Sequence, residues 1–522
     1  MARVLVAEPL SPRGLDHLVA EGHTVDARDS VAPEALVEAL QGAQALVVRS
    51  QTRVTAEVLE AAPDLVVVGR AGIGLDNVDV AAATRRGIMV VNAPQSNIVS
   101  AAEHAMALLL AQARNVPQAH AALKAGRWER SRWTGVELAG KTLGVVGLGR
   151  IGALVAQRAL AFGMRLCAYD PYVAPERARQ MGVELLDLED LVATADFLTV
   201  HLPRTPDTVG LLGREVLAKA RPGLRIVNTA RGGIVDEEAL AWAVGEGIVA
   251  GAALDVFATE PTTASPLFEH DAVVVTPHLG ASTREAQDKA GETIGEQVAL
   301  ALAGEFVPYA VNVDAAAASE TVRPFLPMAE RLGRIFSGLC PGTPPELEVT
   351  YQGQLADYDT RIVTLSLLKG LLARGSDEPV TYVNAPQLAA ERGIAVRDTR
   401  TTAAHDYVNL VTIRGGGHAV AGTVFGLRDE ARLVMVEDHA VDIPPARYMA
   451  VVRNDDRPGM IGTVGTVIGR AGVNIADMDV GRSATGAAAL MVLATDQPLP
   501  AAVVEELGAT DGILEVRTVA AE

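Results

Sequence analysis

Three residues that follow short apolar runs have side chains suited to acid–base chemistry on an anionic molecule. Arg231 follows R-I-V-N-T-A, Glu260 lies shortly after A-A-L-D-V-F, and His278 follows V-V-V-T-P. Histidine is the side chain whose ordinary pKa lies nearest neutrality, so His278 is the candidate general base. A carboxylate from Glu260 would orient the ring and stabilise its charged form. Arg231 could hold a substrate carboxylate through two hydrogen bonds. The set therefore predicts proton removal from a substrate that carries a carboxylate.

A glycine pattern supplies the second half of this chemistry. Gly147, Gly149 and Gly152 form G-x-G-x-x-G between a strand-like run at 142–146 and a helix-like run at 150–162. Such glycines permit the tight turn, the approach of a pyrophosphate and close helix packing, and the pyrophosphate meets a helix N-terminus. A second strand-like run ends at Asp170, whose carboxylate suits a ribose 2′-hydroxyl and repels a 2′-phosphate. The pattern predicts NAD, so His278 would act where a hydride is removed from a secondary alcohol.

Further strand-like runs at 196–200, 225–228, 252–256 and 273–275 should bring their carboxyl ends to one cleft. The residues predicted to bind the cofactor there are Gly147, Gly149, Arg150, Ile151, Gly152, Asp170, His201, Leu202, Pro203, Thr229, Ala230, Arg231, Asp255, His278 and Gly280. We interpret His201 as a wall of the cofactor site and not as a base. Ser100 with Glu103 predicts a capping box at the start of an apolar helix, and His104 in that helix is expected to be structural.

Residues 3–95 alternate strand-like and helix-like runs, which predicts another parallel sheet with crossover helices. Arg49 and Arg70 stand at the ends of two of its strands, where open parallel sheets bind ligands. Together they predict an anion clamp, and Gly72 would let backbone amides approach the ligand. The alternatives are a surface role for each arginine and a simple glycine turn.

Composition excludes several classes of function. The chain of 522 residues has a net charge of −19, which argues against a nucleic-acid or anionic membrane surface as partner. Only two cysteines occur, Cys167 and Cys340, so neither a disulfide framework nor a cysteine-rich metal site is expected. No metal is predicted. The N-terminal apolar run is too short for a signal peptide, and a reducing cytoplasm is the expected location.

The C-terminal third reads as two further modules. Residues 315–445 contain four strand-like runs, at 347–353, 408–415, 418–426 and 432–438, without a catalytic constellation. From 448 onward the order is βαββαβ. The predicted fold is α/β: two doubly wound, Rossmann-like parallel-sheet domains, then an α+β domain and a βαββαβ domain. Predicted boundaries are 1–98 with 285–310 for substrate binding, 99–284 for NAD binding, then 315–445 and 448–522.

The segments N-T-A-R-G-G-I-V-D-E, L-D-V-F-A-T-E-P and T-P-H-L-G-A-S-T, together with G-L-G-R-I-G, resemble the D-isomer-specific 2-hydroxyacid dehydrogenases over residues 1 to about 310. R-A-G-I-G-L-D-N-V-D and the long extension resemble the regulated members that act on a phosphorylated substrate. The resemblance implies NAD-dependent oxidation of 3-phospho-D-glycerate to 3-phosphohydroxypyruvate, which begins serine synthesis. It implies Arg231, Glu260 and His278 as catalytic residues, and Arg49, Arg70, Gly72 and Arg130 as substrate ligands.

The same resemblance identifies residues 315–445 as an intervening regulatory domain of the allosteric substrate-binding type and D-R-P-G-M-I-G with G-V-N-I as an ACT domain. It implies serine as an effector near Asn454, Asp456 and Asn474, in a homodimer or homotetramer. An arm of a neighbouring subunit would carry Arg130; a solvated loop is the alternative. Two other functions stay open: a glyoxylate or hydroxypyruvate reductase, and an NAD-sensing scaffold like the corepressors of this fold.

Overall fold

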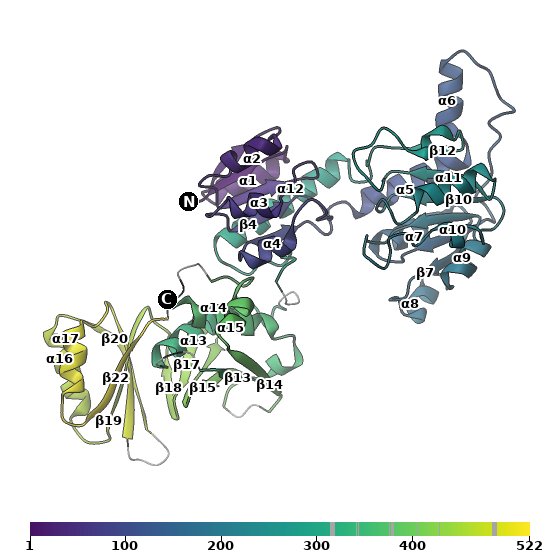
Figure 1. Ribbon diagram of the computed structural model, residues 1–522. Helices are drawn as coiled ribbons and strands as arrows, with labels where there is room; N and C mark the ends of the chain where they lie inside the picture. Colours follow the sequence, from purple (N-terminus) through teal and green to yellow (C-terminus); the bar gives the residue numbers. More distant parts are fainter. Residues whose placement is uncertain are drawn as a thin grey trace. The chain divides into compact units, whose positions relative to one another are not determined.

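The computed structural model describes residues 1–313, 319–340, 342, 344–374, 376, 380–403, 406–426, 428–482 and 488–521. Within these residues the chain forms four β-sheets, each with its own helices (Figure 1). Contacts divide the chain into two compact units, Met1–Asn92 with Ile294–Glu522, and Ala93–Thr293. The predicted domain boundaries stay a prediction, because this division keeps the first sheet and both C-terminal modules in one unit.

The first sheet has five parallel strands in the order β2-β1-β3-β4-β5. Its elements are β1 (Arg3–Val6), α1 (Pro12–Ala20), β2 (Thr24–Ala27), α2 (Pro33–Ala39), β3 (Ala45–Val48), α3 (Ala56–Glu60), β4 (Val67–Arg70), α4 (Val80–Arg85) and β5 (Met89–Asn92). The strand order reverses between β1 and β3, so the loops after these two strands flank the position where such sheets bind ligands.

The second sheet has seven parallel strands in the order β12-β11-β10-β9-β6-β7-β8. Its strands are β6 (Thr142–Val146), β7 (Arg165–Tyr169), β8 (Glu184–Leu185), β9 (Phe197–Val200), β10 (Leu224–Asn228), β11 (Val249–Leu254) and β12 (Val273–Val275). The helices are α5 (Ile98–Ala113), α6 (Val116–Lys124), α7 (Arg150–Ala161), α8 (Pro175–Gln180), α9 (Leu188–Thr194), α10 (Arg214–Leu217) and α11 (Glu237–Gly245), with a 3-10 turn, η1 (Pro266–Glu269). The order reverses between β6 and β9, directly beside the glycine turn.

Helix α12 (Arg284–Leu302) carries the chain back to the first sheet. Ile294 and Val298 lie against β4 so closely that a Cβ at Gly69 would come within 2.9 and 2.8 Å of their methyl groups. The absence of a side chain at Gly69 therefore lets the helix cover this sheet.

The third sheet is mixed, in the order β14-β13-β15-β16-β17-β18. Its elements are α13 (Phe325–Leu339), β13 (Glu346–Gly353), a 3-10 turn η2 (Gln354–Asp357), α14 (Arg361–Ala373), α15 (Ala385–Glu391), β14 (Ala395–Thr401), β15 (Asn409–Gly415), β16 (His418–Phe425), β17 (Glu430–Val436) and β18 (His439–Ile443). The four predicted strands are present as β13 and β15–β17. Strands β14 and β18 and the three helices were not specified by the sequence pattern. Apolar residues of α13 and α14 fill the core against the sheet.

The last sheet is antiparallel, in the order β20-β21-β19-β22. The chain order β19 (Tyr448–Asp455), α16 (Met460–Arg470), β20 (Ile475–Arg482), β21 (Ala488–Thr495), α17 (Ala501–Gly508) and β22 (Ile513–Val519) confirms the predicted βαββαβ unit. Both helices cover one face of the sheet (Figure 1). The predicted fold class is thus confirmed for all four parts.

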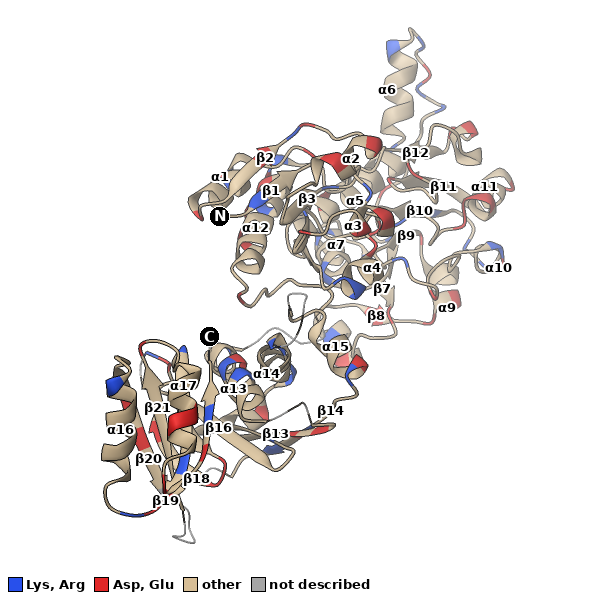
Figure 2. Ribbon diagram, turned by 60° about the vertical axis from the view of Figure 1, so that its left-hand side comes forward, with Lys and Arg blue, Asp and Glu red and all other residues tan. Residues whose placement is uncertain are grey.

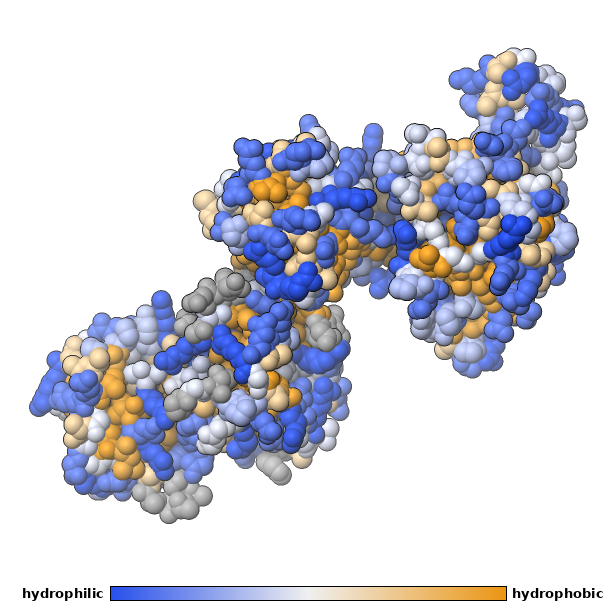
Figure 3. Space-filling model, viewed as in Figure 1, coloured by the Kyte–Doolittle hydropathy of each residue, from blue (hydrophilic) through white to orange (hydrophobic). Residues whose placement is uncertain are grey.

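Charged residues of both signs are interspersed along the helices and loops of each sheet domain (Figure 2). The face seen in Figure 3 is mostly hydrophilic, with small apolar areas on each part. Among the described helices, none is both long and apolar enough to span a membrane.

Candidate active site

A short polar contact at the strand ends of the seven-stranded sheet joins His278 to Glu260. The Nδ1 atom of His278 lies 2.6 Å from Oε2 of Glu260. The other oxygen, Oε1, accepts a hydrogen bond from the backbone amide of Phe257 at 2.8 Å. Partial burial disfavours the carboxylate, but the hydrogen bonds from His278 and Phe257 outweigh it and lower the pKa of Glu260. With Nδ1 engaged, Nε2 of the ring is left to face a substrate, and the side chain is 45% exposed.

A buried carboxylate holds the loop that carries His278. Asp255, which follows β11, is 0% exposed. Its Oδ1 accepts from the amide of Leu279 at 2.7 Å and its Oδ2 from the amide of Gly280 at 2.7 Å. Its backbone oxygen accepts from the amide of His278 at 2.8 Å. Burial opposes ionisation of Asp255, but its hydrogen-bond donors, His104 and Thr276 among them, hold its pKa below the ordinary value.

Arg231 lies in the turn after β10, the strand next to β11 in the sheet. Asn228 at the end of that strand donates from Nδ2 to the backbone oxygen of Arg231 at 3.0 Å and accepts from the amide of Ala230 at 3.0 Å. The same turn contains Thr229, whose hydroxyl is buried and has no hydrogen-bond partner among the described residues. An unpaired buried hydroxyl at a strand end is a position where a ligand can supply the missing partner.

The glycine turn has the geometry that a pyrophosphate requires. Gly147 has φ +95°, and a Cβ there would come within 2.7 Å of the backbone oxygen of His201. A Cβ at Gly152 would collide with the backbone oxygen of Gly147, so both positions are restricted to glycine. Gly149 is the N-cap of α7 and has open space above it, and no side chain caps the helix there. The first amides of α7, including those of Arg150 and Ile151, can therefore bind an anion.

Asp170 lies at the end of β7 beside this turn. Its Oδ2 accepts from the amide of Leu148 at 2.8 Å and its Oδ1 from the amide of Tyr172 at 2.9 Å. Each carboxylate oxygen can accept a further bond, so the hydroxyls of a ribose can still be bound.

His201 lies at the carboxyl end of β9, and Leu202 and Pro203 follow it in the chain. Burial lowers the pKa of His201 to about 4, and its Nε2 lies 2.9 Å from Thr199 Oγ1. A ring that stays neutral at pH 7 suits a cofactor wall.

In the first sheet the loop after β3, which carries Arg49, is also held by a buried carboxylate. Glu8, just after β1, accepts the amides of Arg49 and Thr52, each at 2.9 Å. Asn77 donates to the backbone oxygens of the same two residues at 2.9 and 2.6 Å. This loop lies at the reversal between β1 and β3. The fold thus presents Arg49 from a fixed backbone.

Arg70 ends β4, the strand beside β3. Gly72, two residues on, has φ +152°, and a Cβ there would collide with the guanidinium of Arg70. The glycine therefore leaves room for the arginine side chain as well as for a ligand. Asn92 at the end of β5 donates from Nδ2 to the backbone oxygen of Ile73 at 2.8 Å, which fixes the turn.

Arg130 lies in an arm, and not at the strand ends. The arm comprises α6 and the loop 125–137, which extends from the body of its domain (Figure 1). Arg130 is exposed, and Trp128 beside it is 82% exposed. Arg132 ties the loop to its own domain through Asp271, at 2.6 Å between Nη2 and Oδ2.

The predicted effector residues lie around the loop between β19 and α16. Asn454 is only 2% exposed, and its Nδ2 donates to the backbone oxygen of Asp455 at 2.7 Å. Asp456 is exposed at the loop itself. Asn474 precedes β20, and its amide donates to Oδ1 of Asp496 at 3.1 Å. Asp456 and Asn474 are thus near the surface, whereas Asn454 is enclosed within the sheet.

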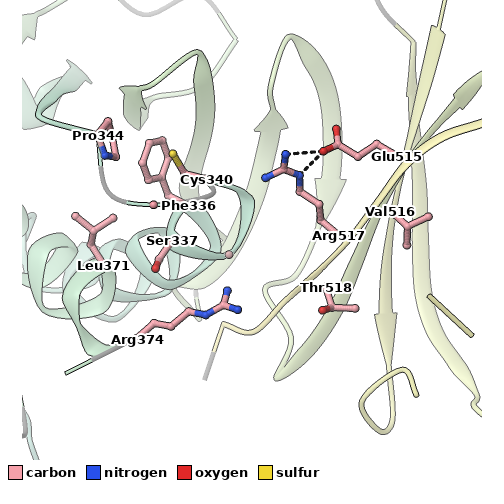
Figure 4. Close-up of a pocket in the computed structure, with 12 residues that line it drawn as sticks. Phe336, Ser337, Cys340, Pro344, Leu371, Arg374, Glu515, Val516, Arg517 and Thr518 are labelled. Atoms are coloured by element: carbon pink, nitrogen blue, oxygen red, sulfur yellow. Dashed lines mark hydrogen bonds and ion pairs between the residues drawn. The ribbon is translucent and has the colours of Figure 1, made fainter. Parts of the chain in front are cut away.

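A cavity of about 600 Å³ lies where α13 meets β22 (Figure 4). Arg374 at the end of α14 and Arg517 on β22 line it, and Arg517 is bonded to Glu515 at 2.6 Å. The cavity joins the third sheet domain to the fourth, so a change in either one alters its walls.

Sequence reasoning missed the groups that hold the loops. Glu8, Asn77 and Thr276 were not singled out, and Asp255 was assigned to the cofactor alone. The capping box at Ser100 is wrong: the N-cap of α5 is Asn97, three residues earlier, and the Ser100 hydroxyl instead lies 2.7 Å from that of Thr283. One signal was available for Glu8 and Asp255, since each is an acid within two residues of the end of a strand whose last three residues are buried.

Models of three protein families match the chain. They are D-isomer specific 2-hydroxyacid dehydrogenase, NAD binding domain, over residues 106–280; D-3-phosphoglycerate dehydrogenase intervening domain, over 321–437; and ACT domain, over 448–512.

Curated proteins are similar over nearly the whole length. The D-3-phosphoglycerate dehydrogenase of Mycobacterium tuberculosis is 50% identical over 504 residues, which are 95% of each chain. That of Archaeoglobus fulgidus is 44% identical over 98% of this chain and 99% of its own. Among solved structures, the TT0316 protein of Thermus thermophilus has a TM-score of 0.55 and 38% identity, over 59% of this chain and 99% of its own.

Proposed function

The chain belongs to the D-3-phosphoglycerate dehydrogenases, and we propose that His278, Glu260 and Arg231 carry out its chemistry. It is an NAD-dependent enzyme that oxidises 3-phospho-D-glycerate to 3-phosphohydroxypyruvate, the first step of serine synthesis by the phosphorylated route. The observation that supports the catalytic assignment is the 2.6 Å contact between His278 and Glu260 at the strand ends of the sheet that carries the glycine turn. Relatives that match along the whole chain favour this activity over a reductase or a corepressor-like scaffold.

In the proposed mechanism the His278 ring removes the proton of the substrate's 2-hydroxyl group through Nε2. Glu260 holds Nδ1 and stabilises the imidazolium that forms. Arg231 binds the substrate carboxylate and stabilises the negative charge that develops on the oxygen at C2. NAD, when bound by the glycine turn and Asp170, supplies the acceptor for the hydride from C2.

Substrate choice in this proposal depends on the first sheet. Arg49 and Arg70, at the ends of adjacent strands, bind the phosphate, with Gly72 allowing close approach. A protein with net charge −19 needs such local positive charge to hold a trianionic substrate. The buried Glu8 supports this role, because it fixes the backbone of Arg49 while its own charge is satisfied by amides.

The activity is tested by NADH formation from NAD and 3-phospho-D-glycerate, with the product trapped by hydrazine. D-Glycerate is the matched substrate without the phosphate. We expect Arg49→Ala and Arg70→Ala each to lower kcat/KM for the phosphorylated substrate by about 10²-fold and to leave the low value for D-glycerate unchanged. Equal losses for both substrates would show that the two arginines do not bind the phosphate. This result would not contradict the proposed reaction.

Regulation is proposed to lie in the fourth sheet domain. Serine would bind near Asp456 and Asn474, since an exposed carboxylate can bind the amine and an amide group the carboxylate. Buried Asn454 would act through the sheet and not by direct contact. We also propose a homodimer or homotetramer in which the arm of one subunit supplies Arg130 to the substrate site of another. The cytoplasm, a reducing compartment, suits the two unpaired cysteines.

The subunit proposal has its own test. Light scattering gives the oligomeric state, and Arg130→Ala mixed with an inactive His278→Ala chain tests exchange between subunits. A shared site would restore activity in mixed oligomers, since one composite site would then contain both native residues. No recovery after verified subunit mixing would place Arg130 outside the site.

A further inference from the structure

His278 lies in a backbone conformation that its surroundings must enforce. Its φ is +56°, in the left-handed region that residues other than glycine rarely occupy. Such a conformation is strained and persists only where neighbouring contacts determine it. The relevant contacts are those of the His278 loop, residues 276–283, which connects β12 to α12.

Much of the polar contact of this loop converges on the buried Asp255. Beyond the amides of Leu279 and Gly280, Oδ1 of Asp255 accepts the hydroxyl proton of Thr276 at 2.6 Å. A buried carboxylate is stable only when hydrogen bonds replace its lost hydration. Every donor that leaves Asp255 therefore weakens the attachment of the loop.

One further group reaches this carboxylate from outside the loop. The Nε2 atom of His104, on α5, lies 3.2 Å from Oδ1 of Asp255 and 3.1 Å from Oγ1 of Thr276. The side chain of His104 is 19% exposed, on a helix whose inner face is otherwise mostly Ala, Leu and Met. A histidine that served only packing on such a face would not place a ring nitrogen between a carboxylate and a hydroxyl.

The same helix also contacts the other end of the loop. Oγ of Ser100 lies 2.7 Å from Oγ1 of Thr283, which caps α12 by accepting the amide of Ala286 at 3.1 Å. Helix α5 therefore holds the loop at residue 276 through His104 and at residue 283 through Ser100. His278 lies between the two attachments.

We propose that His104 is a positioning residue for the proton transfer, acting on His278 through Thr276 and Asp255. The inference rests on the proposed role of His278 as base. Without the donor from α5, the loop relaxes and the catalytic ring no longer sits at a fixed distance from the substrate hydroxyl. Small misplacement of a catalytic group reduces turnover while binding of substrate and cofactor is largely kept.

The test uses the full-length protein with His104→Leu and His104→Gln, assayed for NADH formation from 3-phospho-D-glycerate. We expect His104→Leu to lower kcat about tenfold with less than a threefold change in either KM. His104→Gln retains an N–H donor at similar reach and should recover most of kcat. Gln112→Met is the matched control, because Gln112 is a buried polar residue of the same helix that lies against Gly251 in β11 and not against the loop.

Hydrogen exchange of the peptide spanning residues 276–283 gives a readout independent of turnover. The amides of Leu279 and Gly280 should exchange faster in His104→Leu and not in Gln112→Met. Thr276→Val combined with His104→Leu should cost little more than the worse single change, since both act through Asp255.

Three results would overturn the proposal: an unchanged kcat in His104→Leu, an equal loss in Gln112→Met, or unchanged exchange of the loop. His278→Ala separates this inference from the catalytic assignment. Full turnover in His278→Ala would refute His278 as base, and the exchange data would still decide whether His104 fixes the loop.

Discussion

The strand-end region of the seven-stranded sheet and the effector loop of the fourth sheet domain are built in different ways. Around His278, a buried carboxylate, two backbone amides and a hydroxyl fix a loop within one chain. Around Asp456, the other exposed group, Asn474, belongs to a separate turn before β20, and the side chain of the enclosed Asn454 donates only to the backbone oxygen of Asp455 among the contacts described. Catalysis requires a site organised before the substrate arrives, whereas an effector site must respond to its ligand.

The two proposed sites also differ in where their residues lie in the fold. The proposed catalytic residues all belong to turns after neighbouring strands of one sheet: His278, Glu260 and Arg231. The proposed serine site presents an exposed carboxylate on Asp456 and an exposed amide on Asn474, and neither belongs to the sheet that carries the glycine turn. Substitutions in the two regions should therefore separate turnover from regulation.

The largest effect is expected in the catalytic region, from Arg231→Ala. Loss of the only group proposed to bind the substrate carboxylate and the developing oxyanion should lower kcat/KM by about 10³-fold. Arg231→Lys should recover little, because an ammonium cannot make the bidentate contact. Steady-state rates over a range of 3-phospho-D-glycerate give the values. A lysine variant with nearly full activity would show that charge alone suffices.

A smaller loss is expected for Glu260→Gln. The amide keeps a contact with His278 but cannot stabilise the imidazolium, so kcat should fall on the order of 10²-fold with little change in NAD affinity. Glu260 has a pKa below its ordinary value, so the pair should stay intact until pH falls through that lowered value. Rates measured from pH 5 to 9 should therefore show no loss caused by protonation of Glu260. A Glu260→Gln variant with the native rate at each pH would show that Glu260 does not assist His278.

His201 should affect stability more than turnover. Its folded pKa is about 4 against an ordinary value of 6.5, so between these values the unfolded chain binds more protons than the folded one. Stability is therefore lost as pH falls from about 6.5 towards 4. His201→Asn removes this term, and its thermal midpoint should fall less than that of the native protein between pH 7 and 5. If the thermal midpoints of the two proteins fall in parallel with pH, the His201 ring is not held neutral by burial.

The smallest effect on turnover is expected from Asp456→Ala in the effector loop. Because Asp456 belongs to another sheet domain, kcat without effector should stay within about twofold, while inhibition by serine should weaken by tenfold or more. Asp496→Ala, which removes the carboxylate that holds the Asn474 backbone, should weaken inhibition less. Unchanged serine inhibition in Asp456→Ala would move the effector site elsewhere.

Much of the fold followed from the sequence because short apolar runs and glycine turns are local signals. The positions of His278, Arg231 and Asp170 could be predicted because each follows a strand, and parallel strands bring their carboxyl ends to one edge of the sheet. The attachments were not predictable in the same way. His104 lies on a helix 151 residues before Asp255 in the chain, and their contact depends on how α5 packs against β11 and β12. The helices α13 to α15 were missed because apolar runs alone do not separate a buried helix from a strand.

The role of His278 as catalytic base is tested most directly by comparing His278→Ala with the native enzyme. Two measurements are made on the same preparation. NAD affinity is measured by calorimetry, and turnover by NADH formation from trapped 3-phospho-D-glycerate oxidation. If His278 is the base, we expect His278→Ala to keep an NAD dissociation constant within about threefold of the native value and to lower kcat by at least about 10³-fold. Turnover near the native rate with intact NAD binding would contradict it.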